Sequence, residues 1–143
     1  MSVLLKLVEK AVSRQLECHL NGTELFSSHQ SSYRTHHSTE TALNRILNDV
    51  YNGFNANQST VLVALDQSTA FDCIDHSTLL DRLRHTFGIT GKALDWLSSY
   101  LHGRSSFVRH NNVSSATSAV DTGIAQGSSL GPLLFSTYIA PLS

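Results

Sequence analysis

Residues 60–76 read TVLVALDQSTAFDCIDH, a short apolar run followed by three aspartates. The run at 60–65 is nearly continuous, and its length and β-branched content favour a buried central strand over a helix. Asp66 follows this run directly, at the position where open sheets place their functional sites. A carboxylate there is a hard oxygen ligand suited to Mg²⁺, although a strand-end aspartate also commonly caps the turn that follows.

Asp72, Asp75 and His76 follow Asp66 closely in the sequence, and these three residues could together form a metal cluster. Near the start of a helix, residues of these types more commonly serve as caps and as partners of the helix dipole. Both interpretations stay open on the sequence alone. A soluble enzyme that used Asp66, Asp72 and Asp75 would be expected to hydrolyse a small phosphate ester with a metal ion.

Two helices are predicted on the N-terminal side of this strand. The first covers residues 3–20, whose apolar side chains follow helical spacing: Leu4, Leu5, Val8, Val12, Leu16 and Leu20. Residues 27–37 are polar and predict a loop or short irregular strands. Ser38 or Thr39 then caps a second helix. One face of that helix carries its apolar residues, which are Leu43, Ile46, Leu47, Val50 and Phe54.

Two more helices, a hairpin and a final apolar segment are predicted on the C-terminal side. The helices cover 77–87 and 91–102, and a glycine follows each of them. A polar turn separates the two hairpin strands, 105–111 and 117–121. A glycine-marked loop then leads into the apolar segment 132–142. Helices and strands together give an α+β fold class.

Composition narrows the classes of protein that fit. The chain has 143 residues, which suits one domain, and its 41% hydrophobic content excludes intrinsic disorder. Lys and Arg number 10 against 11 Asp and Glu, which argues against a protein that binds nucleic acid mainly through phosphate contacts. Cys18 and Cys73 form no C-x-x-C, so a reducing compartment is expected. Lys6 and Glu9 interrupt the apolar start, so no signal peptide is expected, and polar residues argue against a membrane helix at 122–143.

Two short catalytic motifs are present only in part. Residues 127–131, GSSLG, match the nucleophile elbow G-x-S-x-G, but no Asp, Glu or His follows Ser129 to complete a triad. Gly91 and Lys92 match the end of a P-loop, but Ala93 stands where that motif requires Ser or Thr. Neither a serine hydrolase nor a P-loop protein is therefore expected.

Three longer segments occur in a fixed order along the chain. Residues 28–43 read SHQSSYRTHHSTETAL, residues 63–76 read VALDQSTAFDCIDH, and residues 123–135 read GIAQGSSLGPLLF. They resemble three segments of the reverse transcriptase of non-LTR (LINE-type) retrotransposons. These are the fingers segment H-Q-x-G-F-R-x-x-x-S-T-x-x-A-L, palm motif A, L-D-x-S-x-A-F-D-x-V-D-H, and motif B, G-V-P-Q-G-S-x-L-G-P-x-L-F. Residues 87–89 and 96–104 also follow the family's spacing, so the resemblance covers essentially the whole chain.

This resemblance implies a partial fingers–palm of a right-hand polymerase. It divides a partial reverse transcriptase domain, residues 1–143, into a fingers-like segment at about 1–58 and a partial palm at about 59–143. The implied function is that of a fragment of an RNA-directed DNA polymerase. The implied partners are an RNA template, a DNA primer and a deoxynucleoside triphosphate, with Mg²⁺ as cofactor and no membrane. The nucleus or the cytoplasm is the expected location.

The resemblance also implies roles for particular residues. Asp66 matches the motif A carboxylate that binds both Mg²⁺ ions, and the carbonyl of Gln67 is expected as a further ligand and nucleotide contact. Phe71 matches the bulky residue that closes the sugar pocket against a 2′-hydroxyl, which selects deoxynucleotides. Gln126 and Gly127 match the motif B turn, where a small residue lets the backbone approach the incoming nucleotide.

One further role and several departures from the family pattern complete the comparison. Arg34, in the fingers segment, is expected to contact template or triphosphate. Ser32, Tyr33 and Ala125 stand where the family has Gly, Phe and Pro. The motif C sequence F/Y-x-D-D does not occur, and no Asp-Asp pair is present.

The missing motif C leads to three expectations. The chain is expected to be truncated before the motif C hairpin, to be inactive alone, and to fold poorly because the strand at 61–65 lacks a partner. The alternative is a catalytically dead domain that acts as a nucleic-acid or protein-binding module.

Overall fold

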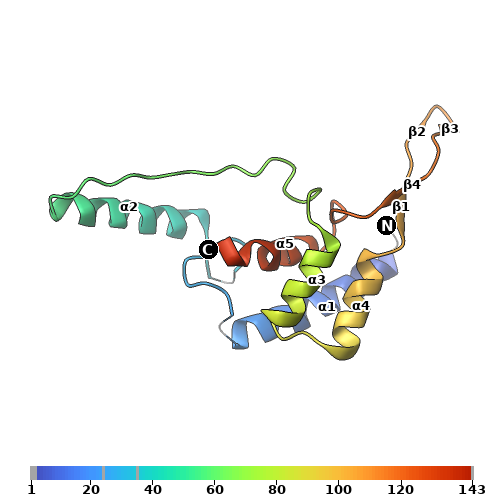
Figure 1. Ribbon diagram of the computed structural model, residues 1–143, viewed down its shortest axis with the longest axis horizontal. Helices are drawn as coiled ribbons and strands as arrows, with labels where there is room; N and C mark the ends of the chain where they lie inside the picture. Colours follow the sequence, from blue (N-terminus) through green and yellow to red (C-terminus); the bar gives the residue numbers. More distant parts are fainter. Residues whose placement is uncertain (1–2, 24, 35, 143) are drawn as a thin grey trace.

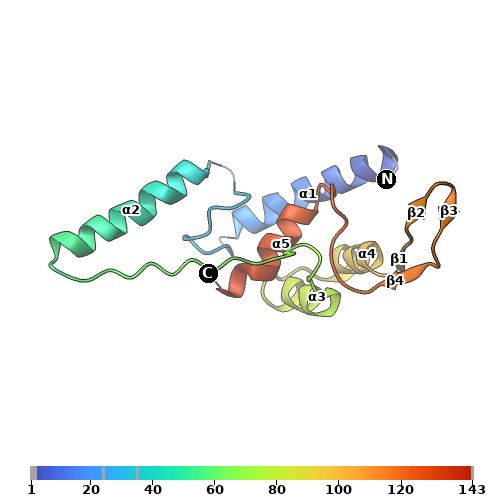
Figure 2. The same ribbon diagram turned by 90° about the horizontal axis from the view of Figure 1, so that it is seen from above.

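Four helices form the core of the molecule. The computed structural model describes residues 3–23, 25–34 and 36–142. The core helices are α1 (Val3–Gly22), α3 (His76–His85), α4 (Gly91–Leu101) and α5 (Gly131–Ile139), which a short 3₁₀ turn, η1 (Ala140–Leu142), follows. Helix α3 packs against both α4 and α5, and α1 lies along the same cluster (Figures 1 and 2). None of the described helices is long and apolar enough to cross a membrane.

The buried apolar side chains come from segments that lie far apart in the sequence. Phe87 is fully buried, and its ring centroid lies 5.9 Å from that of Phe26, in the loop after α1. The loop before α5 contributes Ile124 and Leu130, so it is anchored in the same core as the helices. The other buried apolar residues are Leu16, Leu20, Ile74, Leu79, Leu83, Ile89, Leu97, Leu101, Leu133 and Leu134.

The sequence-based predictions for α3 and α4 are confirmed. Helix α3 begins after Asp75, whose side chain accepts a hydrogen bond from the Thr78 amide at 2.7 Å and another from the Ser77 hydroxyl at 2.7 Å. These bonds, the one from Ser77 first, favour the charged carboxylate and lower the pKa of Asp75 from 3.8 to about 2. Asp75 is thus a helix cap, which supports the structural interpretation of this aspartate over the metal-cluster interpretation.

Helix α1 forms as predicted, but its buried face differs from the predicted one. The buried residues of α1 are Glu9, Ser13, Leu16 and Leu20. Leu4, Leu5 and Val8 were expected on that face and are exposed instead. In this part of the helix, polar side chains, Glu9 and Ser13, therefore face the core.

Helix α2 (Thr39–Asn55) stands apart from the core, as both ribbon views show (Figures 1 and 2). Ser38 caps it as predicted, because its hydroxyl accepts from the Thr41 amide while the Thr41 hydroxyl oxygen accepts from the Ser38 amide. No residue of α2 is buried. The apolar face predicted for this helix is therefore not covered by any described part of the chain.

The predicted central strand at 60–65 is wrong. Residues 58–67 run back from α2 as an extended chain outside any strand (Figure 1), and Val61 and Leu65 are 84% and 91% exposed. A strand needs a neighbour for its backbone hydrogen bonds, and none of the described strands lies beside this segment. The structure is therefore a mixed helix and small-sheet fold, without the central sheet that the sequence predicted.

The predicted hairpin is present but interrupted. Strand β1 (Arg104–Ser106) pairs antiparallel with β4 (Ser118–Val120), and β2 (Arg109–His110) pairs with β3 (Val113–Ser114). The turn at its tip places two consecutive asparagines at positive φ, a turn that matches the twist of paired strands. The hairpin extends from the end of α4 on the side of the core away from α2 (Figures 1 and 2).

Candidate functional site

The second half of motif A lies directly beside the start of motif B. The amide of Ile124 donates to the carbonyl of Phe71 at 2.9 Å, and the amide of Gly123 donates to the carbonyl of Ile74 at 2.8 Å. Both Ile74 and Ile124 are buried, which fixes this pairing to the core. Two of the three segments that carry the resemblance are thus brought together by backbone hydrogen bonds.

Gly123 makes this close approach possible. Its φ is +81°, a conformation that favours glycine, and a side-chain carbon at this position would lie 2.9 Å from the carbonyl oxygen of Asp72. The carbonyl of Gly123 also lies 2.7 Å from Nε2 of the buried His76, the first residue of α3. Gly123 therefore locks the loop before α5 onto the residues that precede α3.

A polar cavity of about 450 Å³ opens beside this junction. Three of its lining residues have charged or amide side chains: Asp72, Arg104 and Gln126. Strands β1 and β4 and residues 122–126 provide its other walls. A cation, an anion and an amide around one cavity suit a polar ligand that carries both charge and hydrogen-bonding groups.

The sequence-predicted site residues do not all reach this cavity. Gln126 lines it, and Gly127, at a φ of +82°, continues the same turn. Asp66 and Gln67 are exposed on the extended segment and are not among its lining residues. The prediction that Asp66 directly follows a buried central strand is therefore wrong, because that strand does not form.

Phe71 and Arg34 occupy other surroundings. The ring of Phe71 is half-buried against Phe135 of α5, with centroids 5.1 Å apart, while the next residue, Asp72, faces the polar cavity. The guanidinium of Arg34 donates to the carbonyls of Ser27 at 2.9 Å and Gln30 at 3.3 Å. Arg34 thus holds its own loop together.

A cluster around the buried Glu9 was not foreseen from the sequence. One carboxylate oxygen accepts from the Tyr100 hydroxyl at 3.2 Å, and the other accepts from the Ser129 amide at 2.9 Å and the Ser128 hydroxyl at 3.2 Å. Burial raises the pKa of Tyr100, so its phenol keeps its proton near neutral pH. The signal for Glu9 lies in its spacing, because it shares one helix face with Ser13, Leu16 and Leu20.

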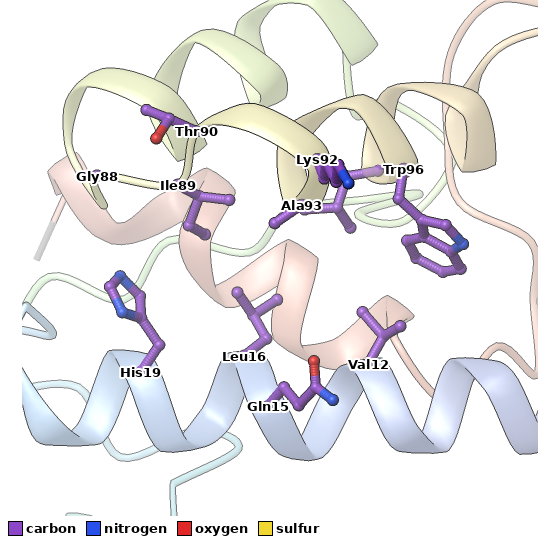
Figure 3. A pocket seen from close by; sticks show the side chains of 11 residues that line it. Val12, Gln15, Leu16, His19, Gly88, Ile89, Thr90, Lys92, Ala93 and Trp96 are labelled. Carbon is purple, nitrogen blue, oxygen red and sulfur yellow. The ribbon is translucent and has the colours of Figure 1, made fainter.

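A second cavity, of about 540 Å³, lies between α1 and α4 (Figure 3). Val12 and Leu16 of α1 face it from one side, and Ile89, Ala93 and Trp96 face it from the other. Its lining is mainly apolar and includes none of the residues for which the resemblance implies a functional role. The polar cavity beside Gln126 is therefore the better candidate for a site that binds a charged substrate.

The mixed helix and small-sheet fold is consistent with the family that the comparison to known proteins finds. The chain belongs to the reverse transcriptase family, because the family described as reverse transcriptase (RNA-dependent DNA polymerase) matches residues 1–143.

Two relatives come from Drosophila melanogaster. A probable RNA-directed DNA polymerase from transposon BS is 30% identical over 142 residues, and one from transposon X-element is 28% identical over 133 residues. These matches cover 99% and 93% of this chain but only 16% and 14% of the two relatives. No solved structure matches the chain significantly.

Reverse transcriptases usually use a divalent metal ion, but the donor set described here does not fit a two-ion site. Among the described residues, no three His, Cys, Asp or Glu side chains come together as a metal site. The carboxylate of Asp75 is engaged as the cap of α3, and Asp72 lines the polar cavity away from the segment that carries Asp66. Mg²⁺ usually needs one or two carboxylates together with substrate phosphates. The described residues therefore support nucleotide binding, and no metal-dependent step is assigned to them.

Proposed function

We propose that this chain is a fragment of a transposon RNA-directed DNA polymerase and that it supplies a nucleotide-binding surface. The observation that carries this proposal is the backbone pairing of residues 71–74 with residues 123–124, which sets Asp72 and Gln126 around one cavity. Family membership supports templated nucleotide transfer as the activity of the whole protein. We further propose that the whole protein is of the non-LTR (LINE-type) class and acts on an RNA template and a DNA primer.

In this proposal Gln126 and Arg104 bind the incoming deoxynucleoside triphosphate. A guanidinium provides several donors for phosphate oxygens, and the amide of Gln126 offers both a donor and an acceptor. The Arg104 guanidinium carbon lies 5.5 Å from the centroid of the Tyr100 ring, so cation–π attraction holds this side chain at the cavity wall. Gly127 lets the backbone of the turn approach the nucleotide without a side chain in the way.

Phe71 is proposed as the residue that selects deoxynucleotides. Its ring packs against Phe135. Gly131 also lies close to the ring, since a side-chain carbon added at Gly131 would be 3.9 Å from it. The ring is not among the residues that line the cavity, so this role rests on the motif A match and on the next residue, Asp72, which does line it. A rigid side chain can exclude a 2′-hydroxyl, whereas a mobile side chain would move aside.

The remaining assignments rest on the resemblance. We propose a fingers-like segment at about 1–58 and a partial palm at about 59–143. We propose Asp66 and Gln67 as ligands of a divalent metal and Arg34 as a contact to template or triphosphate. The hydrogen bonds from the Arg34 guanidinium to the carbonyls of Ser27 and Gln30 support a structural role for Arg34 as well.

Competitive binding of nucleotides to the 143-residue chain tests the proposal. We expect a labelled deoxynucleoside triphosphate to bind in preference to the matching ribonucleotide, and Phe71→Ala to remove that preference. Phe107→Ala is the matched control, because Phe107 is exposed between β1 and β2. Gln126→Ala should weaken binding of both nucleotides by roughly threefold to tenfold, the usual loss for one hydrogen bond.

Two other results would decide against a nucleotide site. Salt-dependent binding of an RNA–DNA hybrid without nucleotide binding would support the alternative of a catalytically dead binding module. Failure to bind either nucleotide or hybrid would overturn the proposed function for this chain.

A further inference from the structure

Glu9 is a fully buried carboxylate that the proposed nucleotide site does not use directly. It lies on α1, yet all three of its hydrogen-bond donors belong to residues remote in the sequence: Tyr100, Ser128 and Ser129. Removing a carboxylate from water is costly unless several donors surround it. This arrangement therefore satisfies a charge in the core and ties α1 to the loop before α5.

Glu9 in turn satisfies hydrogen-bond donors in the loop before α5. The Ser128 hydroxyl oxygen accepts from the amides of Leu130 at 3.1 Å and Gly131 at 3.2 Å, the first turn of α5. Its proton is thereby directed to another acceptor, and an oxygen of Glu9 lies 3.2 Å away, with the Tyr100 hydroxyl at 2.7 Å. The Ser129 amide points to the same oxygen at 2.9 Å. An apolar residue in place of Glu9 would leave both donors without this partner.

The same cluster also contacts Arg104, another residue that lines the polar cavity. The Tyr100 hydroxyl lies 2.7 Å from the Ser128 hydroxyl, and the face of its ring supports the Arg104 guanidinium. Gln126 precedes Ser128 by two residues in a tight turn, in which the Ser128 amide donates to the Ala125 carbonyl at 3.1 Å. Through Tyr100 and Ser128, Glu9 therefore connects to Arg104 and to the turn at Gln126, both of which line the cavity.

We propose that Glu9 is a positioning residue that fixes the turn at Gln126 and Gly127 through Ser128 and Ser129, and so shapes the nucleotide cavity. The proposal rests on the proposed function, because it concerns the same cavity. Glu9 acts through the loop and does not itself line the cavity.

Three variants separate positioning from simple packing. Glu9→Met fills the space with an unbranched apolar side chain but offers no oxygen to the loop. Glu9→Gln keeps one oxygen for Ser128 and Ser129 and can turn its amide toward Tyr100, whose hydroxyl accepts as well as donates. Glu17→Gln, on the same helix but exposed, is the matched control. If Glu9 serves only for packing, loop protection and nucleotide affinity in Glu9→Met should equal or exceed those in Glu9→Gln. If Glu9 positions the loop, both should be clearly higher in Glu9→Gln than in Glu9→Met.

The first readout is amide hydrogen exchange across residues 128–131, with Leu79 to Leu83 of α3 as the internal reference. We expect Glu9→Met to lower protection of the loop by roughly tenfold to a hundredfold, the cost of losing bonds to a charged acceptor. Glu9→Gln should recover most of that protection, and α3 should keep its protection in both variants. Intact loop protection in Glu9→Met, or an equal loss in loop and α3, would overturn the proposal.

The second readout is the affinity of the same variants for a deoxynucleoside triphosphate. We expect affinity to follow loop protection, with Glu9→Met weakest, Glu9→Gln intermediate and Glu17→Gln equal to the unmodified chain. A loosened loop with unchanged affinity would overturn the positioning role. If the unmodified chain binds no nucleotide while the loop still responds to Glu9→Met and Glu9→Gln, the proposed function fails and the hold of Glu9 on the loop stands.

Discussion

Replacing Leu62 and Leu79 by alanine compares the same chemical change at two contrasting positions. Leu62 is 66% exposed on the extended segment, whereas Leu79 of α3 has no exposed surface. The substitution removes three carbon groups worth about 0.8 kcal/mol each when fully buried. With one-third of its surface covered, Leu62→Ala should therefore lower the free energy of unfolding by less than about 1 kcal/mol. Leu79→Ala also leaves a cavity, which brings its cost to about 3–5 kcal/mol.

Urea denaturation followed by circular dichroism measures both costs. Because small domains are stable by only about 5–15 kcal/mol, Leu79→Ala could unfold the chain outright. Ile74→Val, at another fully buried position, is a milder substitute with an expected cost of about 0.5–1.5 kcal/mol. A cost above about 2 kcal/mol for Leu62→Ala would show that residues 60–65 are buried after all, and would refute the exposed segment.

Three further predictions follow from the cap, the glycines and the carboxylates. Asp75→Ala should lower the free energy of unfolding by about 1 kcal/mol; because its folded pKa of about 2 lies below 3.8, this contribution should be complete above about pH 4 and disappear as the pH falls toward 2, which melting temperatures across that range will show. Gly123→Ala should cost clearly more than Gly127→Ala in the same denaturation assay, since both have positive φ but only Gly123 would also place its new carbon against the Asp72 backbone; equal costs would contradict the close approach. Primer extension on an RNA template with Mg²⁺ should be undetectable for the unmodified chain, because Asp66 is a single carboxylate, and extension that Asp66→Ala abolishes would show that this expectation is wrong.

The helices could be predicted from the sequence because their signals are local. Apolar spacing, caps such as Ser38 and Asp75, and the glycines that follow α3 and α4 all act within a turn or two of the helix. The prediction of a strand at 60–65 failed because it rested on local signals, whereas a strand exists only where a second strand pairs with it. Apolar and β-branched residues describe one member of such a pair and say nothing of the other.

The residues of the candidate site also differ in whether local sequence signals reveal them. Gln126 could be placed from the motif B pattern, but its neighbours Asp72 and Arg104 come from other segments, and tertiary contacts alone bring them to the cavity. Glu9 could not be recognised because the apolar spacing assigned Val8 to the buried face. A glutamate within a buried face is explained only when its donors, 91 to 120 residues further along, are known.

The distance along the chain between Glu9 and its loop also sets an order of events during protein synthesis. Ser128 and Ser129 follow Glu9 by 119 and 120 residues. At about 5–20 residues per second, a ribosome needs roughly 6–24 s to add that stretch. The carboxylate of α1 therefore lacks its full set of donors until residue 129 has been added. The cavity beside Gln126 acquires its shape only then, so a nascent chain that stalls earlier carries α1 without the contact that orders the loop.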